Sequence, residues 1–85
     1  MYDQEELIEI DKKYQELLAC WKSRRNDEEA EMVDQAFKLA VEAHSGMRRR
    51  SREPYVYHPI EVAMICAKDM RLDGTSIACA LIHDV

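Results

Sequence analysis

Apolar residues recur at alternating intervals of three and four positions through the first part of the chain. Between residues 4 and 22 the series comprises Leu7, Ile10, Tyr14, Leu17, Leu18 and Trp21. This spacing places the apolar side chains on one side of an α-helix, with Tyr14 and Trp21 as its core anchors. The polar stretch 22–27 interrupts the pattern. Asn26 and Glu29 then form a capping-box sequence, which predicts the start of a second helix.

The second predicted helix has the most regular apolar pattern in the chain. Its apolar side consists of Met32, Val33, Ala36, Phe37, Ala40, Val41 and His44. Ser45 and Gly46 end the helix. On this apolar side we interpret His44 as a buried, hydrogen-bonded residue rather than a metal ligand. Residues 46–57 have no helical period and predict a loop.

The third and fourth predicted helices are apolar on much of their circumference. Pro59 suits the first position of the third helix, which makes His58 its N-cap. Residues 72–74 break that helix, and Asp73 or Thr75 caps the next one. The apolar pattern of the fourth helix has no stop signal before Val85. We therefore expect a truncated domain whose exposed apolar faces associate as a homo-oligomer, most simply a symmetric dimer.

Composition agrees with an all-α fold of about four helices. Of the 85 residues, 47% are hydrophobic and 34% are charged, and only two are glycine and two proline. Such scarcity of turn residues favours helices. We expect one truncated domain, in which residues 1–25 form an N-terminal helix and residues 26–85 begin the main bundle.

Charge and cysteine content narrow the class of protein. The formal net charge of −5 argues against DNA as a partner. Cys20, Cys66 and Cys79 are odd in number and lack CxxC spacing, so we interpret them as buried thiols in a reducing compartment. The acidic N-terminus is not a secretory signal, and no apolar run could span a membrane. A cytoplasmic location follows from these features.

Two groups of residues could carry chemistry. His58 and the adjacent pair His83 and Asp84 are suitable ligands for a borderline divalent cation, and antiparallel helices could bring them together. The alternative is that His58 only caps a helix. Four arginines lie between residues 48 and 52, with Ser51 among them. Guanidinium groups bind phosphate and stack on bases, although such a cluster also fits a solvated loop or an RNA-binding patch.

The order of these motifs resembles the start of the hydrolase domain of RelA/SpoT stringent-response proteins, an HD-type metal-dependent domain. The similar segments are AFKLAVEAHSGMRRRSREPYVYHPIEVAMI and TSIACALIHDV, which cover about residue 30 to residue 85. The resemblance implies the N-terminal part of an HD-domain helical bundle. It also implies Mn²⁺ as cofactor, with His58, His83 and Asp84 as ligands.

The resemblance further implies hydrolysis of the 3′-pyrophosphate of (p)ppGpp, a guanine nucleotide. Arg49 matches an arginine that packs against the guanine base, Arg50 a basic residue near the phosphates, and Ser51 part of the same pocket. The family's water-activating acidic pair would follow Val85, so we expect the 85-residue chain alone to be inactive. Other HD-type nucleotide phosphohydrolases and a non-catalytic helical interaction module remain alternatives.

One position departs from the family pattern. Arg52 stands where the family usually has glycine, within the stretch RRSREPY. If that glycine adopts a positive φ, arginine at the same position strains the loop.

Overall fold

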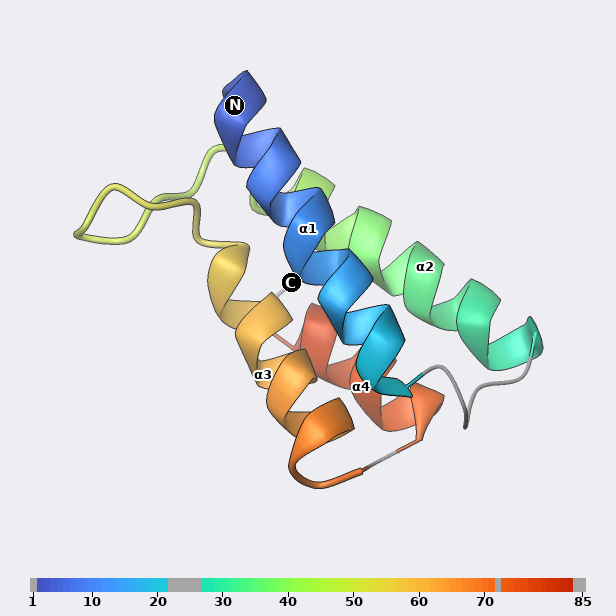
Figure 1. Ribbon diagram of the computed structural model, residues 1–85. Coiled ribbons are helices and arrows are strands. Elements are labelled where there is room, and N and C mark those ends of the chain that lie inside the picture. The colour runs from blue at the N-terminus through green and yellow to red at the C-terminus, as the bar shows by residue number, and fades with distance from the viewer. Residues whose placement is uncertain (1, 22–26, 72, 84–85) are drawn as a thin grey trace.

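The computed structural model describes residues 2–21, 27–71 and 73–83. Within these ranges the chain forms four α-helices, and no strand is present. The helices are α1 (Gln4–Trp21), α2 (Asp27–Ala43), α3 (Tyr57–Lys68) and α4 (Gly74–Ile82), as Figure 1 shows. The predicted all-α fold is confirmed.

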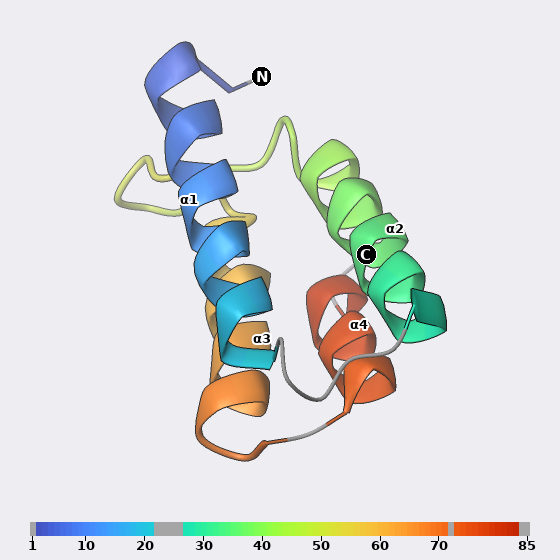
Figure 2. The same cartoon turned by 45° about the vertical axis from the view of Figure 1, so that its right-hand side comes forward.

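The helices pack in a fixed set of pairs around one core. Helix α1 lies along α3, and α4 lies against both α2 and α3 (Figure 2). The core draws side chains from all four helices and from Val56: Ile10, Tyr14, Leu17, Trp21, Val33, Ala36, Ala40, Val56, Ile60, Ala63, Ala67, Ile77, Ala78, Ala80 and Leu81. Tyr14 also stacks on Phe37 of α2, with ring centres 3.7 Å apart. The two predicted anchors, Tyr14 and Trp21, are therefore core residues.

This packing corrects the expectation that α3 and α4 leave broad apolar faces uncovered. Ile60, Ile77 and Leu81 are fully buried, because α1 covers α3 and α2 covers α4. Ile65 is the exception on α3, with half of its surface exposed. These two helices therefore expose less apolar surface for a dimer than predicted, and the dimer stays a prediction.

Helix α4 begins where three helices meet. The Asp73 carboxylate accepts a hydrogen bond from the Ser76 N–H and caps the helix, as predicted. Gly74 follows, and its N–H donates to the Glu29 carboxylate at 3.3 Å. A Cβ atom at Gly74 would lie only 2.5 Å from Cζ2 of Trp21 and 2.7 Å from Cβ of Glu29. Only glycine leaves room for this contact. The capping-box prediction for Asn26 falls outside the described residues.

Helix α3 begins earlier than the sequence pattern indicated. It starts at Tyr57, after an N-cap at Val56 that makes no side-chain cap hydrogen bond. The prediction of His58 as N-cap is therefore wrong. Turn hydrogen bonds from the Tyr57 N–H to Pro54 and from the His58 N–H to Tyr55 start the helix before Pro59. Pro59 is still tolerated, since first-turn N–H groups have no partner within the helix.

The cysteines are free thiols, but they are less buried than predicted. Cys20 and Cys66 are half-buried, whereas Cys79 is exposed. The prediction of a buried thiol is therefore wrong for Cys79. Its side chain faces a shallow apolar groove between α2 and α4 rather than the core.

None of the described helices combines the length and apolar character that crossing a membrane requires.

Candidate functional site

The loop between α2 and α3 is a small hairpin that projects from the helices (Figure 1). The Tyr55 N–H donates to Met47 O, and the Arg49 N–H donates to Glu53 O, both at 3.0 Å. The Arg52 N–H closes the tip by donating to Arg49 O at 2.8 Å. This hydrogen-bond pattern places consecutive basic residues on a tight turn.

The tip of the hairpin contains a backbone conformation that favours glycine. Arg52 has a φ of 71°, in the left-handed region. A short hairpin loop that turns and then places one residue in this region usually has glycine there. Arginine therefore occupies, at this position, the conformation in which a Cβ atom strains the loop. The Arg52 carbonyl accepts a hydrogen bond from Nη1 of Arg48 at 3.2 Å, which helps to hold the residue in place.

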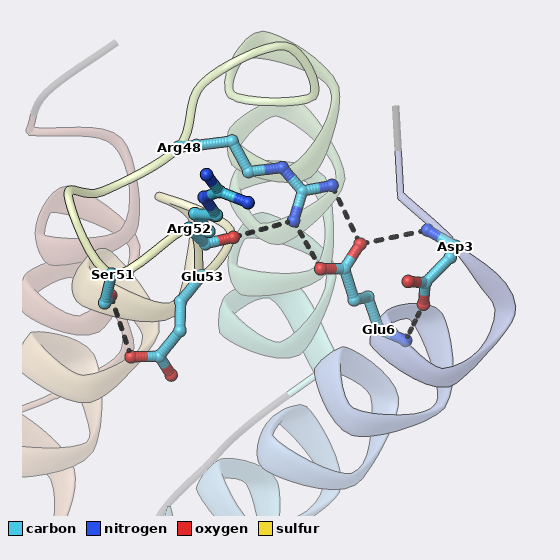
Figure 3. Close-up of polar contacts among 6 residues, drawn as sticks. All are labelled: Asp3, Glu6, Arg48, Ser51, Arg52 and Glu53. Atoms are coloured by element: carbon cyan, nitrogen blue, oxygen red, sulfur yellow. Dashed lines mark hydrogen bonds and ion pairs between the residues drawn. The ribbon is translucent and has the colours of Figure 1, made fainter.

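An ion pair joins this hairpin to the N-terminus of α1 (Figure 3). The Arg48 guanidinium contacts both carboxylate oxygens of Glu6, with Nη2 at 2.8 Å from Oε1 and Nη1 in contact with Oε2. Asp3 and Glu6 also form a reciprocal capping box: each backbone N–H donates to the other's carboxylate, at 3.0 and 2.8 Å. The Arg48 guanidinium holds the pKa of Glu6 at about 2, well below its ordinary value. Sequence reasoning missed this contact, because its partners are 42 positions apart.

The predicted nucleotide-binding residues share one open hollow of about 520 Å³ on the hairpin. Its lining consists of Arg48, Arg49, Arg50, Ser51, Glu53 and Tyr55. Arg49 and Arg50 are exposed. The Ser51 hydroxyl donates to the Glu53 carboxylate at 3.2 Å (Figure 3). The hollow thus presents cationic groups to solvent beside one carboxylate.

A row of rings connects this hollow to the end of α4. The His44 and Tyr55 rings are 5.2 Å apart, Tyr55 and His58 are 6.0 Å apart, and His58 and His83 are 6.0 Å apart, between ring centres. Tyr55 belongs to both features, since it also lines the hollow. The fold therefore brings together two of the three predicted metal ligands, His58 and His83, and places them next to the predicted substrate residues.

Two of these histidine rings are oriented through Nδ1 by a backbone carbonyl of their own helix. Nδ1 of His83 lies 2.6 Å from Ala80 O, a contact that orients the imidazole at the end of α4. His44 is only 1% exposed, and its Nδ1 lies 2.8 Å from Ala40 O. The interpretation of His44 as a buried, hydrogen-bonded histidine is confirmed.

The third predicted ligand, Asp84, lies outside the described residues. Among those that are described, no cluster of three or more histidine, cysteine or acidic side chains could hold a metal ion. Two imidazoles are appropriate donors for Mn²⁺, Fe²⁺ or Zn²⁺, so the pair fits part of a metal site.

The fold and site define an all-α protein in which a histidine pair adjoins a basic hairpin. No protein-family profile matches the chain. Curated relatives do match it, three of which illustrate the range. A putative chloroplastic GTP diphosphokinase RSH1 from Oryza sativa subsp. japonica is 53% identical over 57 residues, or 67% of this chain and 6% of the relative.

A guanosine-3′,5′-bis(diphosphate) 3′-pyrophosphohydrolase from Vibrio cholerae is 47% identical over 55 residues, or 65% of this chain and 8% of the relative. The bifunctional (p)ppGpp synthase/hydrolase SpoT of Escherichia coli is 42% identical over 59 residues, or 69% of this chain and 8% of the relative.

Over the matched segment, the chain belongs to the RelA/SpoT family. It spans only 6% to 8% of the length of these relatives. One relative is named as chloroplastic, and the cytoplasmic location of this chain stays a prediction.

Proposed function

We propose that this chain is the N-terminal part of a metal-dependent hydrolase that removes the 3′-pyrophosphate of (p)ppGpp. The observation that carries the proposal is the contact between two predicted sites. The basic hollow and the His58–His83 pair meet at Tyr55. The names of two relatives, from Vibrio cholerae and Escherichia coli, describe (p)ppGpp hydrolysis and support the same activity.

In this proposal the hairpin binds and orients the nucleotide. The Arg49 guanidinium packs on the flat face of guanine, because a planar cation stacks well on an aromatic base. Arg50 forms charge-assisted hydrogen bonds to phosphate oxygens. Ser51 exchanges its hydrogen bond with Glu53 for one with the nucleotide. The product would be GDP or GTP together with pyrophosphate.

His58, His83 and Asp84 would hold Mn²⁺ beside the bound pyrophosphate. A divalent ion at such a site supplies a bound water of lowered pKa and polarises a phosphoryl oxygen. The hydrogen bond between His83 and Ala80 O fits this role, since ligating histidines are usually oriented through their other ring nitrogen. The acidic pair expected after Val85 would activate the water, so this chain alone should not turn over substrate.

Nucleotide titration of the 85-residue chain tests the binding part of the proposal. We expect ppGpp to bind more tightly than GDP, and the double change Arg49→Ala and Arg50→Ala to weaken ppGpp binding about tenfold or more. The matched control is Lys12→Ala with Lys68→Ala, which removes two exposed positive charges elsewhere. Equal losses in both double variants would indicate a general charge effect.

Turnover separates the remaining alternatives. A longer protein that contains this segment should release pyrophosphate from ppGpp with Mn²⁺. Release from other nucleotides instead would favour a different HD-type phosphohydrolase. Binding without any turnover would favour a non-catalytic interaction module.

A further inference from the structure

Arg48 differs from the other arginines of the hairpin in what its guanidinium contacts. It donates to both carboxylate oxygens of Glu6 and to the Arg52 carbonyl. Among the described residues, none forms a hydrogen bond or ion pair with the guanidinium groups of Arg49 or Arg50. Figure 3 shows Arg48 directed to α1. The four arginines are therefore divided between internal contacts and side chains that face solvent.

We propose that the Glu6–Arg48 ion pair is a positioning device that holds the basic hairpin against α1 and so sets the direction in which Arg49 and Arg50 face the nucleotide. This inference rests on the proposed function for its ligand, a guanosine carrying pyrophosphate groups. Arg48 and Glu6 are positioning residues in this arrangement, since they act through the hairpin backbone and not on the nucleotide.

The Glu6 carboxylate is well suited to act as a fixed anchor. Helix α1 is held against α3 by the buried side chains of Ile10, Leu17 and Trp21. The backbone N–H of Asp3 fixes the carboxylate from its own side. Only 18% of the Glu6 side-chain surface is exposed, against 35% for Arg48, so the carboxylate is the more enclosed partner of this surface ion pair. A carboxylate already held in place loses little further freedom when it binds Arg48.

The Arg48 guanidinium connects this anchor to the tip of the hairpin. The guanidinium donates a hydrogen bond to the carbonyl of Arg52, the hairpin residue that has a positive φ. Arg49 and Arg50 lie between the two bonded positions, so their backbone direction depends on both. Placing charged side chains before the nucleotide arrives lowers the entropic cost of binding.

Amide hydrogen exchange in the 85-residue chain tests whether the ion pair holds the hairpin. Glu6→Gln is the informative change, since glutamine still serves in the capping box but cannot form the ion pair. We expect exchange at the Arg49 and Arg52 amides to rise about two- to fivefold, in the range of surface ion pairs. The Ile77 amide of α4 should not change. Glu5→Gln, on the same first turn, is the matched control.

A double-mutant cycle and a titration complete the experiment. Glu6→Gln with Arg48→Gln should have no larger effect than Arg48→Gln alone, because one interaction is lost only once. The affinity for ppGpp should fall in Glu6→Gln by a factor similar to the change in exchange. Glu5→Gln should bind like the unchanged chain.

The outcomes separate this inference from the proposed function. Unchanged exchange at Arg49 and Arg52 in Glu6→Gln would overturn the role of the ion pair in holding the hairpin. Faster exchange with unchanged ppGpp affinity would overturn its positioning role. If Arg49→Ala with Arg50→Ala leaves ppGpp binding intact, the proposed function and the nucleotide-positioning role both fail, while exchange still decides what holds the hairpin.

Discussion

Replacing Arg52 by glycine should stabilise the protein, although it removes a charged side chain from the hairpin. Arg52 has a φ of 71°, a region in which the Cβ atom crowds the backbone. Glycine lacks that atom and keeps the carbonyl that accepts from Arg48. The substitution therefore removes strain without removing the hydrogen bonds of the turn.

The expected magnitude is the difference between two backbone effects. The left-handed conformation costs an L-residue about 1–2 kcal/mol. Glycine offsets about 0.5–1 kcal/mol of this gain in stability, because its greater conformational freedom stabilises the unfolded chain. The free energy of unfolding should therefore rise by about 0.5–1 kcal/mol for Arg52→Gly. Loss of the exposed guanidinium should contribute little.

Equilibrium unfolding in urea, followed by the helical circular dichroism signal, measures this change. Arg52→Ala is the control, since it removes the same guanidinium but keeps the Cβ atom. It should leave the free energy of unfolding nearly unchanged. Arg50→Gly tests whether the stabilisation is specific to position 52, because Arg52 and Arg71 are the only described residues with a positive φ. A free energy of unfolding that is lower for Arg52→Gly than for Arg52→Ala would refute the reasoning.

Four further predictions address other parts of the molecule. Gly74→Ala should lower the free energy of unfolding by about 1–3 kcal/mol, because the new Cβ atom would collide with Trp21; urea unfolding measures the loss, and an unchanged midpoint would contradict it. Glu6 has a folded-state pKa of about 2, so its contribution is complete above its ordinary value of 4.5 and is lost as the pH falls from there toward 2. Amide exchange in the hairpin, corrected for intrinsic rates, should follow that range and lose this pH dependence in Glu6→Gln. In a longer protein with Mn²⁺-dependent activity, His58→Ala or His83→Ala should abolish turnover while leaving the circular dichroism spectrum intact, and near-normal turnover would remove that residue from the metal site. Sedimentation at micromolar concentration should show a dimer of the 85-residue chain, whereas a single monomeric species would argue against self-association.

Local sequence pattern was sufficient for the features that depend on near neighbours. The alternating spacing of three and four located α1 and α2, because an amphipathic helix needs nothing more than one apolar side. Asp73 was one of two predicted caps, with Thr75, since a capping hydrogen bond reaches only three residues along the chain. Attention to the backbone of Arg52 came from the family resemblance, which places glycine where the structure has a positive φ, and not from the local pattern.

The tertiary structure decided the features that join distant parts of the chain. Glu6 and Arg48 meet only because α1 packs along α3, and no periodicity signals a pair 42 positions apart. Position 74 is confined to glycine because a Cβ atom there would collide with Trp21 of α1 and Glu29 of α2. These properties depend on which helix surfaces pack together. The local sequence around a residue therefore cannot indicate a partner that only the packed core brings within reach.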